Sequence, residues 1–189
     1  MNISPTEAEE SLAAIQAMVQ KTRRSISSSG AYLFLIIWGC IWLVGFMGSQ
    51  FLPAPINGWL WLVLDTIGGV LSAIVGIRMG QQVRSTTHNH SGKRIGAFWL
   101  LLFLYCIAAI TVAWPVDGKQ ASMFIILFVM VGWLAMSLLY SFTPVWVGLA
   151  FTGISLVGYF LLPEYFYLWM AILGGGGLIA LGLYIRYRW

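Results

Sequence analysis

WLVLDTIGGVLSAIVGIR, residues 61–78, is the run of sequence that decides the fold. It is long and apolar, and it contains Asp65, the one charge deep inside an apolar segment. A related run, WMAILGGGGLIALGLYIR, stands at residues 169–186. Five residues of the first run recur there at a constant offset of 108: Trp61, Gly68, Gly69, Ile77 and Arg78. The same kind of apolar, glycine-containing segment therefore occurs twice in the chain.

The composition is that of an integral membrane protein. Hydrophobic residues make up 60% of the 189 residues and charged residues 8%, whereas about a quarter of the residues are charged in soluble domains. A helix needs about 20 mostly apolar residues to cross about 30 Å of hydrocarbon. The sequence predicts one membrane domain, residues 31–189, with six such spans: 31–52, 57–79, 95–115, 120–140, 144–162 and 165–185.

The positive charges predict the orientation. Nine of the ten Lys and Arg residues fall on one side of a six-span arrangement, and only Lys119 falls on the other. Both termini are therefore expected in the cytoplasm. The net charge of +4 is expected to meet anionic lipid headgroups rather than nucleic acid. The predicted location is a bacterial-type cytoplasmic (inner) membrane. The chain looks like the small six-span bacterial membrane proteins built from repeated hairpins, but in architecture alone, and no property is carried over from them.

Residues 31–81 and 139–189 form a predicted internal repeat. Aligned without gaps, they share eleven identities in fifty-one positions, among them Trp, Gly, Pro and Arg. Spans 1 and 5 run in the same direction, so the repeat is parallel, about an axis near the membrane normal. We expect an all-α integral membrane fold of six transmembrane helices in three hairpins, with spans 1 and 2 repeated as spans 5 and 6.

Residues 1–30 are predicted to form an amphipathic cytoplasmic helix followed by a hinge. A capping box from Ser4 to Glu7 marks the start of the helix. Two interpretations stay open, docking of a cytoplasmic partner protein, or contact with the bilayer surface or the protein's own inner face. The apolar stripe that would make either contact consists of Leu12, Ile15, Val19 and Ile26.

Asp65 is the candidate functional acid. It shares a predicted helical face with Gly69, Ser72 and Gly76, and small residues let membrane helices approach closely. We expect this face to meet protein rather than lipid, because that is where an intramembrane carboxylate is tolerated. The repeat places Leu173 at the equivalent position, so the acid is not needed to build the hairpin. It serves either function or neighbour binding, or it is a carboxyl that stays protonated or bonded locally.

Four consecutive glycines are the other unusual feature of the spans: Gly174, Gly175, Gly176 and Gly177. Glycine lowers helix stability relative to alanine, so a run of four requires a reason. One interpretation is close packing against another span. The other is a flat surface for a lipid tail, a quinone-like ring or a cofactor.

The sequence contains no nucleophile motif, metal-ligand cluster or phosphate-binding loop. We therefore expect no enzyme, no catalytic residues, no metal and no cofactor. The function predicted first is that of an accessory, regulatory or partner-binding subunit of a membrane complex. Its partner would be another membrane or cytoplasmic protein, or a second copy of the chain. The alternative is a small transporter or channel that moves protons or a lipophilic solute by means of Asp65.

Overall fold

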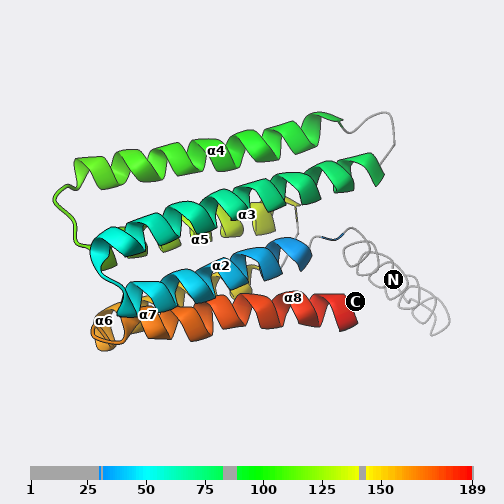
Figure 1. Cartoon of the computed structure of the whole chain (residues 1–189). Helices are drawn as coiled ribbons and strands as arrows, with labels where there is room; N and C mark the ends of the chain where they lie inside the picture. Colours follow the sequence, from blue (N-terminus) through cyan, green and yellow to red (C-terminus); the bar gives the residue numbers. More distant parts are fainter. Residues whose placement is uncertain (1–29, 31, 83–88, 141–143, 189) are drawn as a thin grey trace, which may run out of the picture.

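The computed structural model describes residues 30, 32–82, 89–140 and 144–188, which form a bundle of helices joined by short connections (Figure 1). The predicted docking helix with Leu12, Ile15, Val19 and Ile26 lies outside the described residues. The elements are α2 (Tyr32–Phe51), α3 (Ala54–Gln82), α4 (Asn89–Val112), α5 (Gly118–Tyr140), α6 (Val145–Leu161), α7 (Phe166–Trp169), η1 (Met170–Gly176) and α8 (Gly177–Arg188).

Five helices are long and apolar enough to cross a membrane. They are Tyr32–Phe51, Ala54–Met79, Arg94–Val112, Gly118–Leu139 and the continuous helix Phe166–Arg188. Helix α6 is also apolar, but it has only 17 residues, and its length of roughly 26 Å is less than the hydrocarbon thickness of about 30 Å. The structure therefore has the helices of a multi-pass membrane protein, with the predicted fifth span shorter than expected.

The first hairpin is tighter than the sequence predicts. Its connection consists of Leu52 and Pro53 only, because α3 begins at Ala54 rather than at residue 57. Pro55 is tolerated inside the new boundary, since the first turn of a helix leaves its N–H groups without intrahelical partners. Every residue of α3 is consequently three positions further from the start of its helix than expected.

Hydrogen bonds between side chains join α2 to α3 at two levels. Near the connection, the Trp61 Nε1–H donates to the Ser49 hydroxyl at 2.9 Å. Further along, the Trp38 Nε1–H donates to the Ser72 hydroxyl at 3.1 Å. Such bonds stabilise helix pairs in lipid, where apolar side chains alone gain little from leaving the hydrocarbon.

The core lies between α2, α5 and the C-terminal helix. In the most apolar continuous stretch of 18 residues, 6% of the α3 residues are buried inside the bundle, against 39% for the corresponding stretch of Phe166–Arg188. Helix α3 packs on α2 along one side and is otherwise peripheral. The buried core residues are Leu35, Ile41, Trp42, Phe46, Met123, Ile126, Met130, Phe166, Met170, Ala171, Leu178 and Ile185. Most of the α3 surface is thus open to lipid or to another protein.

Glycines bring α2 and the C-terminal helix into backbone contact. A Cβ added at Gly175 would lie 2.5 Å from the Leu43 nitrogen and 2.9 Å from the Gly39 carbonyl oxygen. A Cβ added at Gly182 would lie 3.1 Å from the Tyr32 carbonyl oxygen. Because no side chain fits between the two helices at these positions, small residues are required there.

Candidate functional site

Asp65 lies near the middle of its membrane helix. The apolar part of α3 runs from Ala54 to Met79, so Asp65 stands eleven residues from one end and fourteen from the other. The residue count of the sequence placed Asp65 about seven residues from the outer end of its span, in the outer leaflet; the helix begins earlier, at Ala54, which makes the count eleven.

The Asp65 side chain lies on the outside of the bundle. Its residue is exposed, and no hydrogen bond or ion pair joins it to another described residue. The protein neighbour that the sequence led us to expect is therefore not supplied by the described helices of the same chain. An aspartate at the centre of a membrane helix costs about 3 kcal/mol on insertion scales, which makes an external partner favourable.

Open glycines flank Asp65 on the same side of α3. A Cβ added at Gly69 or at Gly76 would meet nothing within 4 Å, and the same holds at Gly58. These residues are spaced by seven, four and seven positions, which keeps them on one face of a helix. We call Gly58, Asp65, Gly69 and Gly76 the α3 strip. It extends along roughly 27 Å of helix, nearly the thickness of the hydrocarbon.

Ser72, which stands seven residues after Asp65 and so on the same face of α3, lies at the edge of the α3 strip that faces α2. It is half-buried and accepts the hydrogen bond from Trp38, so it is part of the contact with α2. Gly58 lies in the first turn of the predicted span 57–79 and was not grouped with Asp65 in the sequence. Its spacing of seven from Asp65 was the signal that could have revealed it.

The four glycines of the run 174–177 have different surroundings: two face α2, one faces α6 and one faces open space. Gly174 is buried beside Trp42, and Gly175 is buried against the α2 backbone. A Cβ at Gly177 would lie 3.2 Å from the ring of Phe151 in α6, whereas one at Gly176 would meet nothing within 4 Å. The run falls partly in the π-helical segment Met170–Gly176, whose i→i+5 hydrogen bonds add a residue to the turn. Three of the four glycines thus serve the packing of the protein's own helices.

Within the part of the chain that the structure describes, no group of three or more His, Cys, Asp or Glu side chains is placed to hold a metal ion. Comparison with protein-family models, with curated proteins and with solved structures finds no match to this chain. The candidate functional site among the described residues is therefore the α3 strip. It has a single carboxyl at mid-span, and the glycines on either side of it would let another helix approach closely.

Proposed function

We propose that this chain is a non-catalytic subunit of a membrane complex, and that the α3 strip binds a transmembrane helix of a partner protein. The observation that supports this role is the exposed Asp65 at mid-span, without a partner among the described residues and flanked by glycines with open space. A second helix could approach α3 closely at Gly69 and Gly76. It would remove the carboxyl from lipid and supply its hydrogen bonds.

The chemistry of Asp65 limits the partner helix. A basic side chain at mid-depth would pair with the carboxylate, and a hydroxyl or amide would bond to the protonated form. Small residues on the partner would match the glycines of the strip. We therefore expect a partner whose transmembrane helix has one polar side chain at mid-span and a small-residue face beside it.

The proposed topology has six spans with both ends of the chain in the cytoplasm of a bacterial-type inner membrane. Its support is that α3 ends, α4 begins and α8 ends at one end of the bundle (Figure 1), where Arg78, Arg94, Arg186 and Arg188 lie, whereas Lys119 follows the start of α5 at the other. A positive-inside distribution fits that arrangement. A sixth span requires that α6, which packs along α5, crosses a locally thinned bilayer.

The tryptophans at equivalent positions of the proposed repeat, Trp61 and Trp169, both pack on the preceding helix, but at positions that are not equivalent. The indole of Trp61 lies where a side chain on Gly45 would be, and the indole of Trp169 lies where one on Gly158 would be. Both tryptophans donate to the preceding helix, Trp61 to Ser49 and Trp169 to the Ile154 carbonyl oxygen at 2.8 Å. The offset of 108 pairs Gly45 with Gly153 rather than with Gly158, and a Cβ at Gly153 would meet nothing within 4 Å. The support for the repeat is therefore the sequence identities and not these contacts.

Transport by means of Asp65 is the alternative, and the position of the acid favours binding instead. Asp65 lies outside the bundle and does not line the 500 Å³ cavity between α5 and α6. A path for a solute or for protons through the single chain would need polar groups that lead to and from the acid. None of the described side chains is hydrogen-bonded to it.

The test is purification of the wild-type chain and of Asp65→Leu from native membranes in a mild detergent, followed by measurement of particle mass and protein content. We expect a stoichiometric second protein with the wild type and about tenfold less of it with Asp65→Leu, since one intramembrane polar contact is worth about 1–2 kcal/mol. The matched control is Thr66→Leu, whose exposed hydroxyl bonds only to its own helix at Leu62.

A lone monomer would contradict the proposed role. A homo-oligomer that Asp65→Leu dissociates would keep the α3 strip as an interface but would replace the partner protein by a second copy of the chain. Equal recovery of the second protein with Asp65→Leu and with the wild type would remove Asp65 from the interface.

A further inference from the structure

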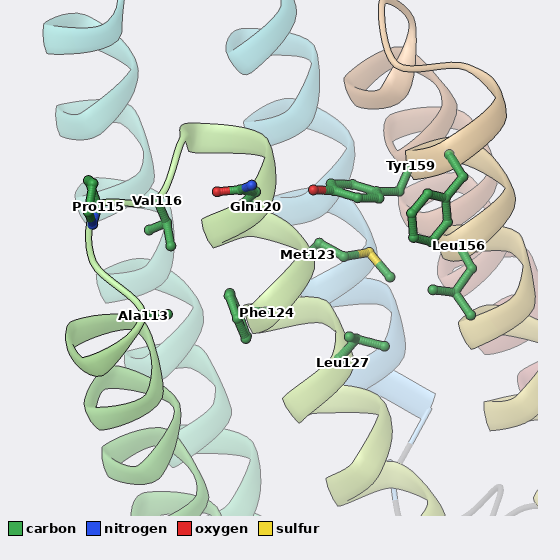
Figure 2. A pocket seen from close by; sticks show the side chains of 10 residues that line it. Ala113, Pro115, Val116, Gln120, Met123, Phe124, Leu127, Leu156 and Tyr159 are labelled. Atoms are coloured by element: carbon green, nitrogen blue, oxygen red, sulfur yellow. The ribbon is translucent and has the colours of Figure 1, made fainter.

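A cavity of about 500 Å³ opens between α5, α6 and the connection that joins α4 to α5. It lies at the end of the bundle opposite the last residues of α3 and α8. Helix α5 contributes Gln120, Met123 and Leu127, and helix α6 contributes Leu156 and Tyr159 (Figure 2). A volume of 500 Å³ is within the range of ligand sites, about 300–1,000 Å³.

The polar groups of the cavity gather at one end. Figure 2 shows the Gln120 amide and the Tyr159 hydroxyl on the same level, with the hydroxyl directed toward Gln120. The Gln120 side chain is held by a capping box, because its Oε1 accepts from the Asp117 N–H at 3.2 Å while the Gln120 N–H donates to Asp117 Oδ1 at 2.7 Å. The two N–H groups of the Gln120 amide nitrogen and the Tyr159 hydroxyl have no hydrogen-bond partner among the described residues.

The rest of the cavity is apolar and runs into the membrane. Gln120 is in the first turn of α5, which begins at Gly118, so it lies at the level of the lipid–water interface. Leu127 is seven residues further along, roughly 10 Å deeper. The cavity is thus lined by hydrogen-bond donors at the interface and by apolar side chains about 10 Å deeper. A phospholipid has the same order, with its ester groups at the interface and its acyl chains in the hydrocarbon.

We propose that this cavity binds a glycerophospholipid of the adjacent leaflet, with an acyl chain against Met123, Leu127 and Leu156 and an ester carbonyl accepting hydrogen bonds from Gln120 and Tyr159.

The test uses the full chain in proteoliposomes that contain a phospholipid with a photoactivatable diazirine in mid-chain, and maps the adducts by peptide mass spectrometry. We expect adducts to concentrate on residues 123–127 and 156–160, above residues 100–104 of α4, although the α4 residues are more exposed than 123–127. Tyr159→Phe keeps the aromatic ring and should reduce this labelling about fivefold, the loss expected for one hydrogen bond. Tyr184→Phe, at an exposed tyrosine of α8, is the matched control.

A second variant tests whether the lipid chain occupies the cavity. Ala113 lines the cavity and is exposed at the end of α4, so Ala113→Trp should fill the opening and suppress the labelling of residues 123–127. Ala108→Trp places the same side chain on the exposed surface of the same helix and should not. Adducts that follow exposure evenly over α3, α4 and α6, or labelling that neither Ala113→Trp nor Tyr159→Phe reduces, would overturn the proposal.

Discussion

Gly175→Ala is expected to lower the free energy of unfolding by about 2 kcal/mol or more, the range of an overpacked core substitution. The added methyl group would lie 2.5 Å from the Leu43 nitrogen and 2.9 Å from the Gly39 carbonyl oxygen. Both neighbours are backbone atoms, so neither can move by a change of rotamer. The C-terminal helix must shift away from α2, and the core residues between them lose contact.

Thermal unfolding in detergent measures this effect, which should appear as a decrease of about 4–8 °C in Tm. Gly176→Ala is the matched control, since a Cβ there meets nothing within 4 Å. Alanine is favoured over glycine in a helix by about 1 kcal/mol, so this neighbouring substitution should be neutral or stabilising. Equal Tm values for the two variants would show that α2 and the C-terminal helix do not make the close contact at Gly175.

Gly69→Leu is expected to abolish association with the partner protein and to leave the stability of the chain unchanged. The position has open space around it within the single chain, so the fold accommodates a leucine there. A helix docked on the α3 strip would instead meet four additional carbon atoms at the point of closest approach. Small-residue contacts between membrane helices are sensitive to such an increase in size.

Recovery of the partner with purified Gly69→Leu, together with Tm, measures both halves of this prediction. Gly153→Leu is the matched control, because Gly153 is exposed on α6 and also has open space around it. The control should keep both the partner and the stability. Full partner recovery with Gly69→Leu would place the interface elsewhere on the protein.

Hydropathy and length predict most of the helices, because a membrane span is defined by composition more than by specific contacts. The predicted boundaries differ from the structure where proline occurs. Pro53 and Pro55 suggested a longer connection, but the first turn of α3 accepts Pro55. The π-helical segment at residues 170–176 could not be predicted, since it depends on how the glycine run fits against α2 and α6.

Asp65 is recognisable in the sequence as the candidate site because a charge inside an apolar segment is rare. Helical periodicity also groups it correctly with Gly69 and Gly76. Periodicity does not say which neighbour covers a face, so it could not show that Ser72, on the same face, bonds to Trp38 of α2. The same limit applies to Gly39 and Gly182, whose role in the contact between α2 and α8 becomes visible only when the two helices are seen together.

Site-specific photo-crosslinking in native membranes tests most directly whether the α3 strip is a protein interface. A photoreactive diazirine amino acid replaces Leu62, which is exposed three residues before Asp65 on α3 and lies beside it on the helix surface. The same amino acid replaces Leu104, exposed on α4, as the control. We predict a discrete adduct with one other membrane protein from position 62, which Asp65→Leu removes, and only lipid adducts from position 104. Lipid adducts alone from both positions would contradict the proposed interface.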